Sequence, residues 1–106
     1  FGISGIESAF SVSYKSLVDS GEISLMDLIR LLTVNPARIA RLENVASIEV
    51  GYDGNLALFD IRTDTVIDSK TFISKGKNTP FDGFKGKGEV VATLYKGKVV
   101  YSKRPI

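Results

Sequence analysis

The sequence has 106 residues, of which 43% are hydrophobic and 25% are charged, with a formal net charge of +2 at pH 7. A chain of this length and composition is typical of one small globular domain. So low a net charge gives no general attraction to nucleic acid or acidic lipid. The absence of cysteine and histidine excludes disulfides, sulfur ligands for metals, and imidazole as a base or ligand. Cysteine absence fits the cytoplasm, the compartment we expect, and no apolar run approaches the roughly 20 residues of a membrane-spanning helix.

The first part of the sequence has the spacing of an amphipathic helix. Its apolar residues recur every three or four positions, which places them on one stripe. They are Ile6, Phe10, Tyr14, Leu17 and Val18. Gly21 is expected to end this helix, because glycine readily adopts the left-handed conformation found after a helix end.

Two shorter helices are predicted next. Ser24 followed three positions later by Asp27 resembles a capping box, in which side-chain oxygens accept from free backbone N–H groups at a helix start. Apolar residues then continue to Leu32. Asn35 is predicted to cap a third helix with Pro36 at its first position, where a missing N–H costs little.

From about residue 48 the pattern changes to short runs of β-branched and aromatic residues separated by turns. The runs predicted as strands are residues 56–59, 65–67, 90–95 and 98–101. The last two should form a hairpin whose turn contains Gly97. Residues 74–88, rich in lysine and glycine, are predicted as a long loop. Helices followed by strands indicate an α+β fold or parts of two domains.

Lysines in and beside the predicted loop are the first candidates for chemistry. Lys75, Lys77, Lys85 and Lys87 could approach a phosphate, but their spacing does not match a P-loop, and we favour a solvated loop. Ser74 and Lys77 have the S-x-x-K spacing of penicillin-binding enzymes. That chemistry needs a helix, and the glycine-rich context argues against one.

Acidic residues are the second candidates. Asp53, Asp60, Asp64 and Asp68 could surround a hard cation, but their positions are better explained by turns that bracket short strands. Glu7 lies near the predicted start of the first helix, where its charge would favour the positive end of the helix dipole. The residues taken alone therefore predict no complete active site.

Several runs resemble segments of one family. The opening run F-G-I-S-G-I-E at residues 1–7 resembles the P-F-G-x-x-G-x-E segment of dihydroorotases, members of the amidohydrolase superfamily. The run T-V-N-P-A-R-I at residues 33–39 and the run G-Y-D-G-N-L-A-L-F-D at residues 51–60 resemble motifs of the whole superfamily. The run S-K-G-K-N-T-P-F-D-G at residues 74–83, followed by residues 88–93 and 97–101, is similar to the dihydroorotase tail.

The departures from the family pattern are small. Gly54 and Asn55 replace the usual alanine and aspartate, and Phe84 stands where tryptophan is frequent. These positions shape a turn and a packing surface, so they leave the family resemblance intact. They do not distinguish an active from an inactive homologue.

The resemblance implies that the chain is a C-terminal piece of a longer protein. Residues 1–47 would be helices from the end of a TIM-like (β/α)8 barrel. Residues 48–106 would be the C-terminal strands of a small composite β-sandwich. Barrel helices bury their apolar stripe against a sheet that is not in this chain, so the stripe of the first helix is expected to be exposed.

The resemblance also implies a zinc-dependent hydrolase that interconverts N-carbamoyl-L-aspartate and L-dihydroorotate in pyrimidine biosynthesis. In the family, zinc-bound hydroxide attacks the ring amide while an aspartate moves the proton. Those metal ligands and that aspartate would precede Phe1, so this chain should hold no zinc and should be inactive alone. The family substrate contact that carries over is the backbone at Phe1 and Gly2, where glycine lets a ligand approach closely.

The resemblance further implies a homo-oligomer, with aspartate transcarbamoylase as a candidate partner, and no binding to nucleic acid or membranes. Three alternatives stay open. The parent could be a dihydropyrimidinase, hydantoinase or allantoinase. It could be a dihydroorotase-like subunit that has lost its metal and serves as a partner. The chain could also be a small basic β-rich binding module.

Overall fold

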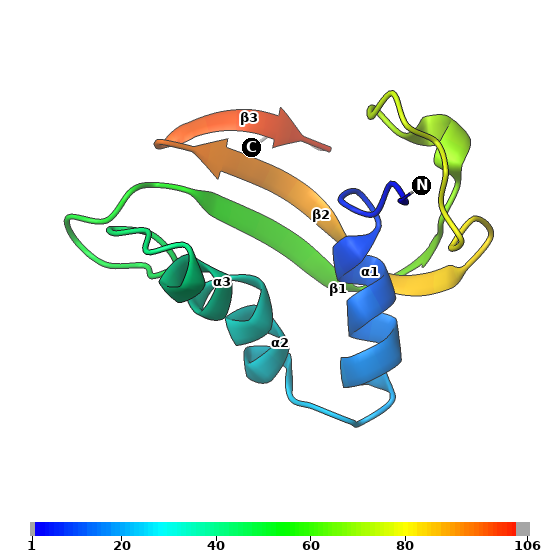
Figure 1. Ribbon diagram of the computed structural model, residues 1–106, viewed down its shortest axis with the longest axis horizontal. Coiled ribbons are helices and arrows are strands. Elements are labelled where there is room, and N and C mark those ends of the chain that lie inside the picture. Colours follow the sequence, from blue (N-terminus) through cyan, green and yellow to red (C-terminus); the bar gives the residue numbers. More distant parts are fainter. Residues whose placement is uncertain (1, 104–106) are drawn as a thin grey trace.

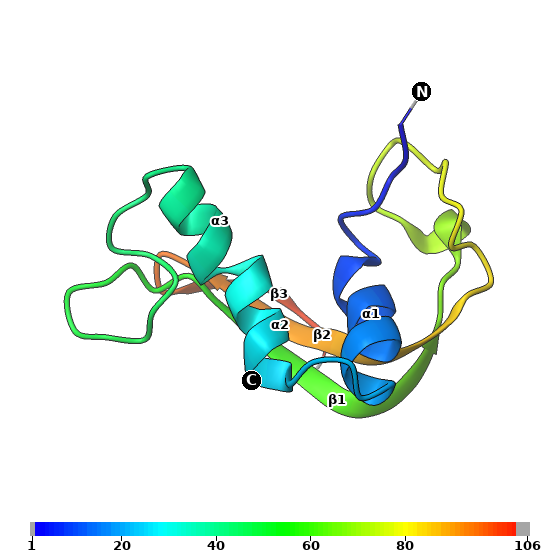
Figure 2. The ribbon, with the colours of Figure 1, turned by 60° about the horizontal axis from the view of Figure 1, so that its bottom comes forward.

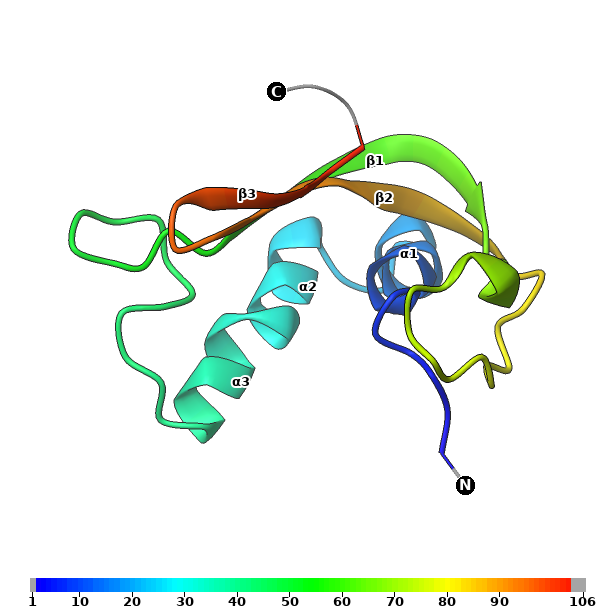
Figure 3. The ribbon, with the colours of Figure 1, turned by 90° about the horizontal axis from the view of Figure 1, so that it is seen from above.

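The computed structural model describes residues 2–103, in which helices precede a three-stranded antiparallel sheet (Figure 1). The elements in chain order are α1 (Ala9–Ser13), the π-helix η1 (Tyr14–Asp19), α2 (Leu25–Leu32), α3 (Val34–Ile39), β1 (Leu56–Val66), the 3-10 helix η2 (Ser69–Thr71), β2 (Lys85–Tyr95) and β3 (Lys98–Ser102). The sheet has the order β1-β2-β3, and α1, α2 and α3 lie on one side of it (Figure 3). The predicted α+β class is confirmed.

The first predicted helix is present in a modified form. It begins at Ala9 as α1 and continues from Tyr14 as η1, whose wider turns the sequence pattern did not indicate. Gly21 ends it as predicted, with a φ of 88° and an N–H that donates to the Val18 carbonyl at 3.0 Å. Ile6 lies outside the helix.

The two shorter helices differ in how well they were predicted. The cap of α2 is confirmed, because the Ser24 hydroxyl accepts from the Asp27 N–H at 3.1 Å. The assignment of Asn35 as the cap of the third helix was wrong. Helix α3 begins at Val34 directly after Thr33, so Asn35 and Pro36 occupy its first turn. The proline is tolerated there because N–H groups of a first turn have no partner within the helix.

The end of α3 is a Schellman arrangement without glycine. The Leu42 N–H donates to the Ala37 carbonyl at 2.9 Å and the Arg41 N–H donates to the Arg38 carbonyl at 3.2 Å. Arg41 has a φ of 57°, a conformation that glycine adopts at lower cost. Leu42 therefore lies beyond the helix.

The sheet is more continuous than predicted. Residues 56–59 and 65–67 were expected as two strands, but β1 runs unbroken from Leu56 to Val66 with irregular pairing after Leu58 and after Asp60, while Ile67 lies just beyond it. The predicted loop 74–88 was too long, because β2 begins at Lys85 and pairs with the end of β1. Two of the glycines that suggested a loop, Gly86 and Gly88, lie in β2 where packing leaves little room for a Cβ. A Cβ at Gly88 would lie 2.9 Å from Cε2 of Phe10 in α1.

The predicted hairpin between β2 and β3 is confirmed. Tyr95 pairs with Lys98, and the two residues between them, Lys96 and Gly97, have φ angles of 49° and 78°. Two successive positive φ angles are typical of the type I′ turn, whose twist matches that of the strands. Asn55 supports the turn, since its Oδ1 accepts from the Lys96 N–H at 2.9 Å.

The core lies between the helices and the sheet. Its buried apolar side chains among the described residues are Phe10, Leu28, Ile67 and Ala92. The Phe10 ring stacks on the Phe59 ring with centroids 3.9 Å apart. The expectation of an exposed stripe on the first helix was therefore wrong for Phe10, because β1 and β2 supply the surface that it needs. Ile6, at the other extreme, is 92% exposed. Figure 2 shows α1 crossing this side of the sheet.

The total accessible surface is large for the mass of the chain. It is 7897 Å² for 11.5 kDa, whereas a folded monomer of this mass exposes about 5,800 Å². Many large apolar side chains contribute, including Ile39, Ile48 and Val50. None of the helices within residues 2–103 is both long and apolar enough to cross a membrane.

Candidate functional site

The segment that opens the chain lies against the loop between β1 and β2 (Figure 1). Asn78 makes two contacts with it. Its side-chain Nδ2 donates to the Gly2 carbonyl at 2.9 Å, and its own carbonyl accepts from the Ser4 N–H at 2.7 Å. Gly2 has a φ of 73° and is exposed. Phe1, the other predicted substrate contact, lies outside the described residues.

Glu7 fastens the other end of the same segment. Its two carboxylate oxygens accept from the backbone N–H groups of Ile73 and Ser74, each at 3.0 Å. The hydrogen bond from the Ser74 N–H, followed by that from the Ile73 N–H, lowers the pKa of the Glu7 carboxyl below its ordinary value. The expected role of Glu7 at the helix dipole thus misses its main contact, which is with a loop 66 residues away in sequence.

The loop itself is closed by further contacts. The Asp82 carboxylate accepts from the Ser69 N–H at 3.0 Å and from the Ser69 hydroxyl at 2.9 Å, and these bonds lower the pKa of Asp82. At the base of the loop, the Ile67 N–H donates to the Phe84 carbonyl at 3.0 Å. A Cβ at Gly76 would lie 2.5 Å from the Ser4 hydroxyl oxygen, so the loop and the opening segment are in close contact there and the Ser4 side chain would have to turn to admit one.

The contact made by Glu7 should make the docking of the loop depend on pH. A carboxylate with a lowered pKa contributes stability that is present above its unfolded pKa and is lost as the pH falls through its folded pKa. We expect the Ile73 and Ser74 amide signals in NMR spectra to shift together as the pH falls through the lowered pKa of the Glu7 carboxyl. Glu7→Gln should abolish this shared step, because a neutral amide side chain does not titrate.

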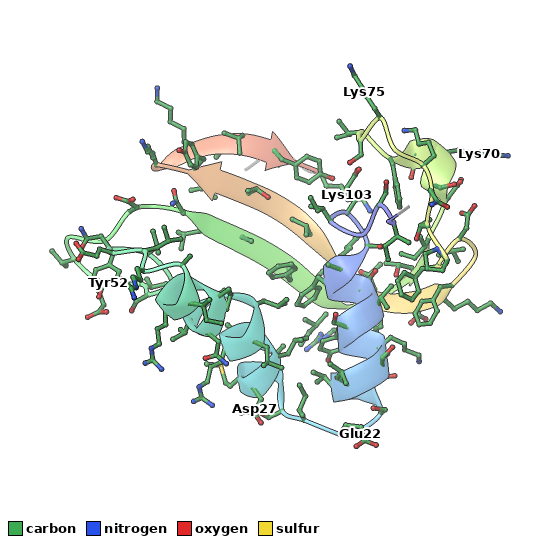
Figure 4. All side chains as sticks on the ribbon, viewed as in Figure 1. Glu22, Asp27, Tyr52, Lys70, Lys75 and Lys103 are labelled. Carbon is green, nitrogen blue, oxygen red and sulfur yellow. The ribbon has the colours of Figure 1, made fainter. Side chains whose placement is uncertain are left out.

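Glu22→Gln is the matched control for this titration. Glu22 is an exposed glutamate for which the structure shows no hydrogen bond within residues 2–103, and Figure 4 shows it at the far end of the first helix from the loop. This variant should leave the step at Ile73 and Ser74 unchanged. A step that persisted in Glu7→Gln would contradict the contact.

The candidate lysines do not converge on one site. The Lys77 ammonium donates to the Phe72 carbonyl, while Lys85 and Lys87 lie in β2, where Lys87 is 3.9 Å from an Asp64 oxygen. Figure 4 shows Lys75 extending away from the loop. Lys75 lies in a solvated loop as predicted, and the four candidate lysines do not gather into a phosphate-binding site. Ser74 lies in a bend rather than a helix, so the S-x-x-K arrangement is a coincidence of spacing.

Asp60 and Asp68, two of the four candidate aspartates, have local structural roles. An Asp60 oxygen accepts from the Arg62 N–H at 2.9 Å, and an Asp68 oxygen accepts from the Lys70 N–H at 3.0 Å at the start of η2. Across residues 2–103, no three histidine, cysteine or acidic side chains come close enough to hold a metal ion. The four candidate aspartates therefore do not form the cation site that was considered for them.

The structure brings together two segments that the sequence presented separately. Gly2 and Glu7 belong to the opening run, and Asn78 belongs to the run at residues 74–83. Asn78 was not among the residues predicted from the sequence to take part in the site. The sequence feature that linked the two runs was their resemblance to the same family, which suggested a contact between them but did not identify its residues.

Comparisons with known proteins agree with the family resemblance seen in the sequence. A family model described as the amidohydrolase family matches residues 2–100. A dihydroorotase from Clostridium botulinum is 42% identical over 102 residues, which cover 96% of this chain and 25% of that protein. A dihydroorotase from Brevibacillus brevis is 46% identical over 101 residues, which cover 95% of this chain and 24% of that protein. The chain thus spans about a quarter of the length of these relatives.

A solved structure shows the same fold. The L-hydantoinase (dihydropyrimidinase) from Arthrobacter aurescens superposes with a TM-score of 0.88 at 30% identity, over 99% of this chain and 24% of that protein. The match therefore includes both the helices and the sheet. On the family model and these relatives together, the chain belongs to the amidohydrolase family.

Proposed function

We propose that the chain is the C-terminal part of a dihydroorotase, which interconverts N-carbamoyl-L-aspartate and L-dihydroorotate in pyrimidine biosynthesis. The observation that carries the proposal is the 42% and 46% identity to dihydroorotases over almost the whole chain. The L-hydantoinase matches at 30%, so the difference in identity favours dihydroorotase over the related cyclic amidohydrolases.

The rest of such a protein would cover the apolar surface of this chain. In this proposal, residues 1–47 close a TIM-like barrel and residues 48–106 complete a β-sandwich. The supporting observation is the accessible surface of 7897 Å², against about 5,800 Å² for a folded monomer of this mass. Exposed side chains such as Ile39 and Ile48 would then lie in contacts with the barrel or the sandwich.

The site of this chain would be the edge of the substrate pocket rather than its catalytic centre. Phe1 and Gly2 would line the substrate through their backbone. Gly2 suits this role because, apart from its neighbours in the chain, no described residue has an atom within 4 Å of where its Cβ would be, so its backbone is open to a ligand. Zinc, which activates water in this chemistry, would be held by residues outside this chain.

The remaining parts of the proposal concern the whole protein. It would be a cytoplasmic homo-oligomer, with aspartate transcarbamoylase as a candidate partner. The alternative of a basic binding module gains no support, because the lysines on which it depended are dispersed between a loop and a strand. Enzymatic activity of the full-length protein would distinguish a dihydroorotase from the alternative of a metal-free partner subunit.

The test is an assay of the full-length protein with zinc. We expect turnover of dihydroorotate to exceed that of hydantoin, dihydrouracil and allantoin. We expect the 106-residue chain alone to be inactive, because it has no histidine or cysteine and the proposal places the zinc ligands outside it. A preference for one of the other cyclic amides would replace dihydroorotase by the corresponding relative. A full-length protein that bound no zinc and turned over none of them would support the metal-free partner subunit.

A further inference from the structure

The opening segment is held at both ends by one loop. Asn78 binds on either side of Ile3, through the Gly2 carbonyl and the Ser4 N–H, and Glu7 binds the N–H groups of Ile73 and Ser74. The path of the backbone from Gly2 to Glu7 is therefore set by the loop at residues 73–78.

Gly2 in particular depends on a side chain for its position. Apart from its neighbours in the chain, no described residue has an atom within 4 Å of its would-be Cβ, so packing on that side does not restrain it. Its φ of 73° is also one that glycine leaves easily, since glycine has access to both signs of φ. The contact that fixes the orientation of its peptide group is the 2.9 Å hydrogen bond from Asn78 Nδ2.

We infer that Asn78 is a positioning residue for substrate binding, acting through the Gly2 backbone. This inference rests on the proposed function, in which Gly2 lines the substrate. The Asn78 amide would hold the Gly2 peptide in the orientation that the substrate meets, so that binding does not have to order it. The substrate class remains a cyclic amide that carries a carboxylate.

The deciding experiment compares asparagine variants in the full-length protein. Asn78→Asp keeps the size of the side chain but replaces the N–H donor by an oxygen. We expect the KM for dihydroorotate to rise about tenfold, the equivalent of one lost hydrogen bond, with kcat and Tm nearly unchanged. Asn78→Ala should give a similar rise, which separates loss of the donor from repulsion between the new charge and an anionic substrate.

Asn55→Asp is the matched control. Asn55 uses its side-chain oxygen, which accepts from the Lys96 N–H, and aspartate retains such an oxygen. This variant should therefore keep the KM of the wild type. A rise in KM that occurs at Asn78 and not at Asn55 would therefore be due to loss of the Asn78 donor.

The other possible outcomes would overturn either the positioning role of Asn78 or the proposed function. An active wild type with an unchanged KM in both Asn78 variants would overturn the positioning role and leave the proposed function standing. A lower Tm with an unchanged KM would show that Asn78 only stabilises the fold, which also overturns it. A zinc-loaded wild type that does not turn over dihydroorotate would overturn the proposed function, and this inference with it.

Discussion

Replacing Phe10 with alanine is expected to lower the free energy of unfolding by about 3–5 kcal/mol. Phe10 is 9% exposed, and its ring stacks on Phe59 with centroids 3.9 Å apart and planes at 22°. The ring also lies over Gly88 and so joins α1 to both β1 and β2. Its removal leaves a cavity at the point where the first helix contacts the sheet. Urea unfolding followed by circular dichroism measures the loss.

Ile6→Ala is the control for this substitution. Ile6 belongs to the same apolar stripe in the sequence, but it is 92% exposed, and its truncation should change the free energy of unfolding by less than about 0.5 kcal/mol. Similar losses for Phe10 and Ile6 would show that the helix does not pack on the sheet as described.

The contrast between Phe10 and Ile6 shows what the apolar pattern could predict. The spacing of the apolar residues placed Phe10 and Ile6 on one stripe. Such a spacing identifies the apolar face of a helix, but it does not give the first residue of the helix or the part of that face that other elements bury. The helix start at Ala9 leaves Ile6 outside, and the sheet covers Phe10. Local signals with a defined geometry predicted better. The Ser24 cap and the Gly97 turn were both correct, since each depends on a few adjacent residues.

Contacts between distant segments limited the rest of the prediction. Glycines at 86 and 88 indicated a loop, yet they lie in β2 because α1 crosses there and leaves no room for a Cβ. The bonds from Asn78 to Gly2 and from Ser74 to Glu7 join residues more than 60 positions apart. No local pattern encodes such pairs. The family resemblance identified the runs that contain them but not the bonds between them.

Gly88→Ala is expected to lower the free energy of unfolding by about 2–4 kcal/mol. Two effects add. Gly88 has a φ of 89°, a conformation that costs an L-residue roughly 1–2 kcal/mol. The new Cβ would also lie 2.9 Å from Phe10 Cε2, so the ring and its helix would have to move away from the sheet. Thermal and urea unfolding of the variant measure the total.

The two effects can be separated with a second glycine. Gly83 has a φ of 82° and, apart from its neighbours in the chain, no described residue within 4 Å of its would-be Cβ, so Gly83→Ala should show the backbone cost alone. In a Phe10→Ala background the ring is absent, and Gly88→Ala should then cost no more than Gly83→Ala does. Because the two residues share one contact, this non-additivity measures how tightly α1 packs on β2. Equal costs for the two glycines in the unaltered background would mean that the ring does not restrict Gly88.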